Sequence, residues 1–344
     1  MLELSTAQRA EAAILRSLLN LPPALRRRLA GPPTSRRGQM LDPQVQLALA
    51  VNRFMGIKHA DELGTARARI RMDVTSAQVT HRPAPIASLE ERKLAGRPVR
   101  IYRPRGERRP GPALLFIHGG GFVVGGLDSH DTPCRELAAR AECTVISLDY
   151  RLAPEHRFPA AADDSLAAFR ALVEEADTLG IDRERIAIGG DSAGGNLSAV
   201  LALDTRADDV RPCFQLLVYP VVDMTMSSPS IDELGQGFFL EKQTIVWYRD
   251  QYLDEAERKD PRASPLFVDD LSGLPPALVV TAGFDPLWDE GAAYAERLRD
   301  AGVEVAHHHH AGMFHGFWNC TNVIEGAERA FDEAVGVTRA ALAR

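Results

Sequence analysis

The stretch 185–202 reads RIAIGGDSAGGNLSAVLA. Its first residues are β-branched and apolar, as in a buried strand, and an apolar helical run follows directly. Between them lies the pattern G-x-S-x-G at 190–194, with Ser192 at its centre. Such a strand–turn–helix holds a serine on a tight, strained turn and aims its hydroxyl at the carboxyl end of a sheet, beside the positive end of the helix dipole. Ser192 is therefore a candidate nucleophile; an N-capping serine in a turn of small residues is the alternative.

Short apolar runs alternate with helical segments on both sides of this stretch. We expect buried strands at 113–118, 143–150, 185–190, 214–220, 277–283 and 303–310, and helices at 131–141, 160–176, 192–204 and 287–301. The stretches ASLEERKLAG and RPVRIYRP, which precede them, have the pattern of an antiparallel pair. Strands that alternate with helices predict an α/β fold with a doubly wound, mainly parallel sheet covered on both faces.

Two segments interrupt this alternation. Residues 1–55 have helical periodicity, with a capping box at Ser5 and Gln8, a loop at GPPTSRRG and a further helix that begins after Asp42. Residues 223–271 are too long for a simple connection and contain the amphipathic stretch GFFLEKQTIVWYRDQYL, so we expect an insertion over the sheet edge. The predicted division is an N-terminal helical part (1–55), a core in two parts (56–222 and 272–344) and the insertion (223–271).

The run ALLFIHGGGFVVGG, at 113–126, ends a predicted strand in three glycines. Consecutive glycines let the backbone approach a substrate and turn successive N–H groups toward one point. With the N–H of Ala193, which follows the candidate nucleophile, such a loop can hold an oxyanion. A phosphate-binding loop is the alternative, but the Lys-Ser/Thr pair of a P-loop does not follow. We expect His118, at the strand end, to form structural hydrogen bonds.

A nucleophilic serine also needs a base, and the base needs an acid that orients it. In this architecture the chain order is serine, acid, histidine. Asp285 lies directly after the strand 277–283 and is the candidate acid. Asp289 and Glu290 fall inside the following helix, where we expect them to face solvent, although a neighbour of Asp285 could still take its role. His315, in the Gly-flanked loop AGMFHGF after the last strand, is the candidate base.

Four contiguous histidines, 307–310, precede that loop. In an extended strand, neighbours point to opposite faces, so His307 shares a face with His309, and His308 with His310. Four imidazoles then cannot converge on one metal ion, and we interpret the run as strand residues. We expect no metal and no organic cofactor.

The bulk composition excludes several classes of protein. The 344 residues carry a formal net charge of −7, which does not fit a nucleic-acid-binding surface. No apolar run approaches the length of a membrane span, and the N-terminus lacks the basic start and apolar core of a signal peptide. The four cysteines have no metal-binding spacing and predict reduced, largely buried thiols. We therefore expect a cytoplasmic globular protein without stable membrane insertion.

In these motifs the sequence resembles the bacterial hormone-sensitive-lipase-like (family IV) carboxylesterases, which have the α/β-hydrolase fold with a mostly parallel eight-stranded sheet. The resemblance covers residues from about 88 to 335 and rests on HGGGF (118–122), DYRLAPEHRFPAA (149–161), GDSAGG (190–195), DPLWDEG (285–291) and GMFHGF (312–317). It implies a cap made by the N-terminal helices and the insertion. It also implies a catalytic triad made by Ser192, Asp285 and His315. The implied oxyanion hole is made by Gly120, Gly121 and Ala193.

The implied activity is hydrolysis of small-molecule esters with short to medium acyl chains, through an acyl-enzyme. A catalytically inactive receptor on the same fold is one alternative, although such receptors lack the histidine that is present here; an amidase or acyltransferase that uses the same triad is another. The strand 303–310 is a candidate sheet edge that could pair across a homodimer. The aromatic residues that could line an apolar pocket, or only pack the cap, are Phe122, Phe238, Phe239, Trp247 and Tyr248.

Overall fold

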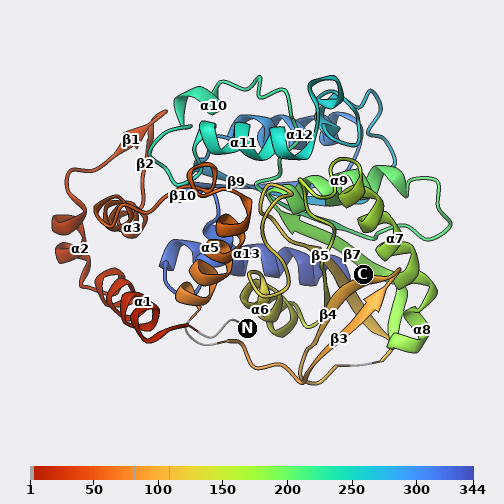
Figure 1. The fold of residues 1–344 in the computed structure, drawn as a ribbon. Helices are drawn as coiled ribbons and strands as arrows, with labels where there is room; N and C mark the ends of the chain where they lie inside the picture. The colour runs from red at the N-terminus through yellow and green to blue at the C-terminus, as the bar shows by residue number, and fades with distance from the viewer. Residues whose placement is uncertain (1–3, 81–82, 108) are drawn as a thin grey trace.

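The computed structural model describes residues 4–80, 83–107 and 109–344, and a single large sheet organises them (Figure 1). Within these ranges the sheet is eight-stranded, in the order β10-β9-β8-β7-β5-β6-β4-β3. Its strands are β3 (Ser88–Leu94), β4 (Arg97–Arg103), β5 (Gly111–Ile117), β6 (Thr144–Leu148), β7 (Ile181–Asp191), β8 (Gln215–Val218), β9 (Ala277–Phe284) and β10 (Val305–Phe314). The β3–β4 and β4–β6 pairs are antiparallel and the other pairs are parallel. The predicted fold class and the predicted antiparallel pair are confirmed.

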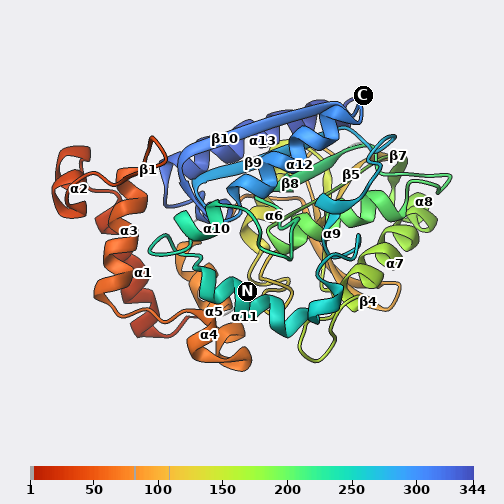
Figure 2. The same ribbon diagram turned by 90° about the horizontal axis from the view of Figure 1, so that it is seen from above.

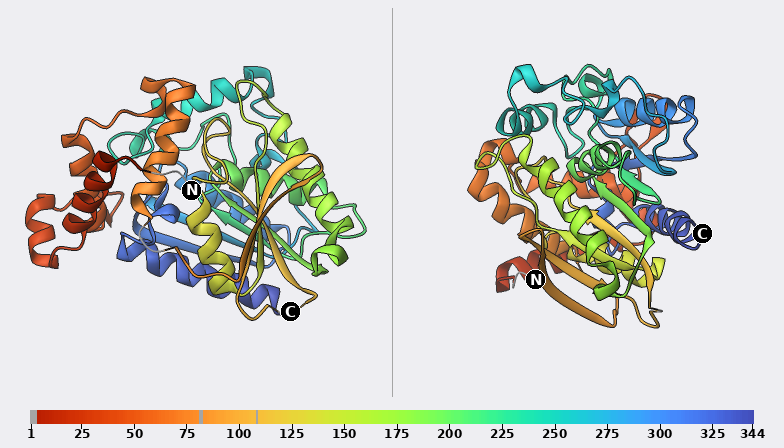
Figure 3. Two further views of the ribbon diagram at one scale, coloured as in Figure 1. Left: turned by 60° about the horizontal axis from the view of Figure 1, so that its bottom comes forward. Right: turned by 90° about the vertical axis from the view of Figure 1, so that its right-hand side faces the viewer.

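Helices cover both faces of the sheet. On one face lie α7 (Ala160–Glu174), α9 (Ala193–Asp204) and α12 (Trp288–Asp300), and on the other α6 (Asp131–Ala141) and α13 (Glu325–Leu342). The right-hand view in Figure 3 separates α7, in green, from α13, in blue, by the strands. The short elements α8 (Ala176–Leu179) and η3 (Phe317–Cys320) complete this part of the chain. Among the described residues, no helix has the length and apolar character that crossing a bilayer requires.

Alternation along the strands builds one apolar core on each face. In β5, Leu115 and Ile117 pack with the α7 and α9 side, whereas Leu114 and Phe116 pack with the α6 and α13 side. All four side chains are fully buried. A parallel strand that is buried on both faces has an uninterrupted apolar sequence, which is why these strands could be predicted.

The N-terminal segment is helical over a longer range than predicted. Its helices are α1 (Thr6–Leu19), α2 (Pro23–Ala30), α3 (Pro43–Phe54), α4 (Ala60–Leu63) and α5 (Thr65–Val79). The capping box at Ser5 and the N-cap at Asp42 are both present. The predicted loop 31–38 contains part of a short hairpin, β1 (Ser35–Arg36) with β2 (Gln39–Met40). Helices α4 and α5 follow the expected boundary at residue 55; α5 packs against α1, and the large sheet begins at Ser88.

The insertion joins these N-terminal helices. It contains α10 (Ser230–Glu233), α11 (Lys242–Tyr252), η1 (Glu255–Glu257) and η2 (Pro265–Phe267). Figure 2 shows α11 beside α4 and α5, and the Thr244 hydroxyl donates a hydrogen bond of 2.6 Å to Asp61 Oδ1 between α11 and α4. The Tyr248 ring packs on the loop after β5, so α11 lies over the carboxyl ends of the parallel strands.

Candidate active site

Three side chains that follow different strands form one hydrogen-bonded chain. Ser192 Oγ lies 2.9 Å from His315 Nε2, and His315 Nδ1 lies 2.8 Å from Asp285 Oδ2. Asp285 is fully buried, and its other oxygen accepts the Leu287 N–H at 2.8 Å. A carboxylate can only accept, so Nδ1 of His315 carries its proton and Nε2 is free to accept the serine proton. The structure thus brings together the three residues singled out as nucleophile, acid and base.

The backbone at Ser192 has the strain expected of this turn. Its φ is +56° and its ψ is −116°, outside the regions that L-residues normally adopt. The Ser192 N–H donates to the carbonyl of Val218 at 2.8 Å, and the Ser192 carbonyl accepts the Asn196 N–H at 3.0 Å. These bonds tie the turn to β8 and to the first turn of α9, and so hold the strained conformation in place.

Glycine at 194 allows the turn to approach the end of β5. A Cβ atom on Gly194 would lie 1.8 Å from the carbonyl oxygen of Ile117, the last residue of β5. No side chain fits at that distance. The pattern G-x-S-x-G therefore does more than free the backbone: it places the loop that follows β5 directly beside Ser192.

That loop is the predicted glycine loop, and contacts on two sides fix it. The Gly119 N–H donates to Asp191 Oδ1 at 2.9 Å. Gly120 and Gly121 both have positive φ, +116° and +58°. A Cβ on Gly121 would lie 2.4 Å from Cγ of Tyr248, so the α11 aromatic ring packs directly on the glycine backbone.

A buried polar network behind the loop was only partly anticipated. His118 forms the expected structural bond, with Nδ1 2.7 Å from the Gly119 carbonyl, and its ring stacks on Tyr150 at 4.2 Å. Burial and the neighbouring His130 lower the pKa of His118 to about 3, so its ring is neutral. Tyr150, in the DYRLAPE stretch, donates to the His118 carbonyl at 2.9 Å, so that stretch supports the strand end that carries the glycine loop.

Asp191 is a member of this network that the sequence analysis missed. It is buried beside the nucleophile, and His130 Nε2 lies 3.2 Å from its Oδ1. Burial alone would raise the pKa of Asp191, but His130 and the Gly119 N–H lower it below its usual value. Asp191 therefore stays ionised and anchors the glycine loop. Asp191 lies inside the G-x-S-x-G turn, and this position is the sequence feature that could have indicated its role.

Glu290 corrects an expectation: it does not face solvent. It is fully buried, and its Oε1 accepts the N–H groups of Val222 at 2.8 Å and Asp223 at 3.2 Å, where the insertion begins. Burial raises its pKa well above the ordinary value. Asp289 is half-buried and accepts the Ser230 N–H at 2.9 Å. The insertion covers this end of α12, which its helical pattern could not reveal.

The five aromatic candidates for a substrate pocket occupy different places. Phe122 is buried and stacks on Tyr252 at 3.9 Å, and Phe238 is buried against Phe284. Trp247 lies beside Tyr248, with centroids 5.1 Å apart.

The other two aromatic candidates approach the reacting groups. Tyr248 covers Gly121, and Phe239, 43% exposed, lies 3.3 Å from where a Cβ of Gly316 would stand, next to His315. Tyr219, which no motif indicated, also contacts the His315 ring, with centroids 4.5 Å apart.

Comparison with known proteins places this arrangement in a family. The family model described as the alpha/beta hydrolase fold matches residues 114–319. A carboxylic ester hydrolase of Mycobacterium tuberculosis is 41% identical over 331 residues, covering 89% of this chain and 85% of the relative. An ethyl acetate hydrolase of Pseudomonas putida is 47% identical over 236 residues, covering 67% and 74%. The structure of an ester hydrolase from the metagenome of Lake Arreo superposes with a TM-score of 0.85 at 40% identity, covering 89% and 100%.

Proposed function

Because the chain belongs to the bacterial hormone-sensitive-lipase-like (family IV) carboxylesterases of the α/β-hydrolase fold, we propose that it hydrolyses short- to medium-chain acyl esters with Ser192 as nucleophile. The observation that carries the proposal is the continuous hydrogen-bonded chain from Ser192 through His315 to buried Asp285. It leaves the serine beside an unprotonated imidazole nitrogen, which is the condition for attack near neutral pH.

The geometry supports a two-step reaction. Ser192 Oγ attacks the ester carbonyl carbon while His315 Nε2 takes the hydroxyl proton, and Asp285 holds the tautomer and stabilises the imidazolium. When the tetrahedral intermediate collapses, the bond to the alcohol oxygen breaks and His315 returns the proton to that oxygen. Water then gives a proton to His315 and attacks the acyl-enzyme. The carboxylic acid leaves, and Ser192 recovers its proton.

In this proposal the N–H groups of Gly120, Gly121 and Ala193 bind the oxyanion. The support is the way the glycine loop is held against the Ser192 turn, through the Gly119 bond to Asp191 and the close packing at Gly194. Donors fixed before the reaction stabilise a developing charge without reorganisation, and one such donor is worth about 10²–10³ in turnover.

Short or medium acyl chains fit the aromatic surroundings of the site. The Tyr248 ring covers the oxyanion loop, and Phe239 stands next to the loop of His315. Two rigid rings beside the glycine loop and the His315 loop favour compact apolar acyl groups. A series of p-nitrophenyl esters of increasing acyl length tests this: we expect the highest kcat/KM at short or medium chains, and a maximum at long chains would contradict it.

The Ser192→Ala variant tests the catalytic assignment. We expect it to fold normally and to lose turnover of p-nitrophenyl acetate by several orders of magnitude, because only the binding and oxyanion contributions remain. Substantial residual turnover in a correctly folded variant would rule out Ser192 as the nucleophile.

We further propose that the helices up to Val79 and the insertion together form the cap, because α11 contacts α4 and the Thr244 hydroxyl donates a hydrogen bond to Asp61.

The edge position of β10 supports a homodimer in which two copies pair through this strand, which light scattering after gel filtration would test. The four free thiols support a cytoplasmic location, which cell fractionation would test.

A further inference from the structure

The histidine run divides between the two faces of β10, as its alternation predicted. On one face, His307 Nε2 and His309 Nδ1 each lie 2.9 Å from Thr281 Oγ1. The second nitrogen of His309 lies 2.9 Å from Gln39 Oε1, and its ring stacks on Trp288. Both imidazoles on this face therefore already have hydrogen-bond partners.

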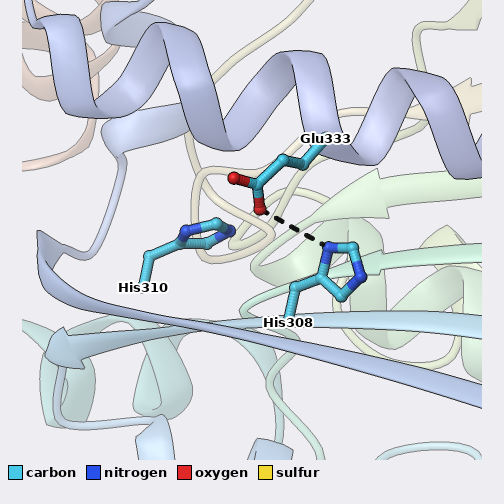
Figure 4. Close-up of side chains that lie close together, drawn as sticks. All are labelled: His308, His310 and Glu333. Atoms are coloured by element: carbon cyan, nitrogen blue, oxygen red, sulfur yellow. Dashed lines mark ion pairs between the residues drawn. The ribbon is translucent and has the colours of Figure 1, made fainter.

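The other face brings three potential metal ligands together. His308 and His310 point from β10 toward α13, where Glu333 reaches back toward both rings (Figure 4). One ligand atom from each residue lies within 4.8 Å of the other two, and Glu333 Oε2 is 3.9 Å from His308 Nδ1. Among the described residues this is the one such group of three.

Two nitrogens in this group are buried without a hydrogen bond. His308 Nδ1 and His310 Nε2 are shielded from water, and neither has a hydrogen-bond partner within the described part of the chain. A buried unpaired polar atom costs about 1–3 kcal/mol, so this arrangement needs compensation.

We propose that His308, His310 and Glu333 bind a divalent transition-metal ion, with Zn²⁺ the species that their chemistry fits best. Two imidazole nitrogens and one carboxylate oxygen form a three-ligand set that zinc accepts, with water in the fourth position. Bonds of about 2.0–2.2 Å place tetrahedral ligand atoms about 3.3–3.6 Å apart. The three ligand atoms now lie within 4.8 Å of one another, and the Glu333 side chain, 57% exposed, has room to move toward the two imidazoles.

The ion cross-links the edge strand of the sheet to the last helix. Its ligands come from β10 and α13, and β10 leads directly into His315. The strand alone offers two ligands on this face, so its sequence predicted no metal. Glu333 supplies the third from a helix 23 positions after His310 in the sequence.

Zinc titration of the chelator-treated protein by isothermal calorimetry tests the site. We expect one equivalent to bind wild type. The H308A/H310A and E333Q variants should bind at least about tenfold more weakly, since even residues behind metal ligands contribute about 10–100-fold to affinity. The matched control H307A/H309A removes two imidazoles from the other face of the same strand and should keep the affinity.

Two further readouts guard against a folding defect. Zinc should raise the unfolding temperature of wild type and of H307A/H309A but not of H308A/H310A, and Co²⁺ should give tetrahedral visible absorption only where the site is intact. Circular dichroism and aryl-ester turnover confirm that each variant is folded. A folded H308A/H310A or E333Q protein that binds zinc as tightly as wild type overturns the proposal, as does a wild type that binds none.

Discussion

Replacing Gly121 by alanine tests how closely α11 packs on the oxyanion loop. The new Cβ would lie 2.4 Å from Cγ and 2.7 Å from Cδ1 and Cδ2 of Tyr248, whereas ordinary contact begins near 3.4 Å. The ring or the loop must therefore move by about 1 Å, and misplacement of that size costs about 10²-fold in rate. Loss of one oxyanion donor costs about 10²–10³ in kcat. We predict that Gly121→Ala lowers kcat on p-nitrophenyl acetate by about 10²–10³.

The variant also carries a backbone cost, which a control separates from the clash. Gly121 has φ +58°, where a Cβ costs about 1–2 kcal/mol. Gly273 has φ +71° with nothing within 4 Å, so Gly273→Ala carries the strain alone and should keep kcat while losing stability. If the clash is the cause, Gly121→Ala should cost less in a Tyr248→Ala background than in wild type. A kcat for Gly121→Ala within a few-fold of wild type would refute this account of the loop.

Three other changes have defined outcomes. Asp285→Asn should lower kcat by about 10⁴ because the amide cannot hold the required histidine tautomer; steady-state kinetics that show a drop below tenfold would exclude Asp285 as the acid. Glu290→Ala should destabilise the protein by about 1–3 kcal/mol for each N–H left unpaired at Val222 and Asp223, whereas Glu290→Gln, which keeps an acceptor oxygen, should lose less. Equal urea midpoints for the two Glu290 variants would contradict this. The third change is in pH: the folded pKa of His118 is lowered to about 3 from an ordinary value of 6.5, so below pH 6.5 the unfolded chain binds a proton that the folded chain does not. The free energy of unfolding should therefore fall on acidification, with up to about 1.4 kcal/mol per pH unit coming from His118, and His118→Asn should flatten the curve; an unchanged slope would count against it.

The position of the candidate site could be predicted from the sequence because each of its three side chains follows the end of a strand. Ser192 follows β7 and His315 follows β10, while Asp285 comes directly after β9. Parallel strands bring their carboxyl ends to the same sheet edge, so local patterns were enough to place these side chains together. The chain order of the three residues then assigned candidate roles.

Features that depend on packing between distant segments could not be predicted from the sequence. The helical pattern predicts that Glu290 is exposed. In the structure, Val222 and Asp223, at the start of the insertion and 67–68 residues earlier in the chain, cover it. The helix α5 was missed because arginines and other polar side chains interrupt its apolar positions. The approach of Glu333 to His308 likewise required the docking of α13 on the edge strand. For Glu290 and Glu333 the deciding neighbour is remote in sequence and leaves no periodic signal.

The most direct test of the central claim is covalent labelling of the nucleophile. Diethyl p-nitrophenyl phosphate transfers its phosphoryl group to an activated serine and releases p-nitrophenol, and peptide mass spectrometry locates the adduct. We predict one adduct per chain, on Ser192, with loss of esterase activity in proportion to labelling, and much slower labelling in His315→Ala. An adduct on a different residue that accounts for the lost activity, or full inactivation with Ser192 unmodified, would contradict the account.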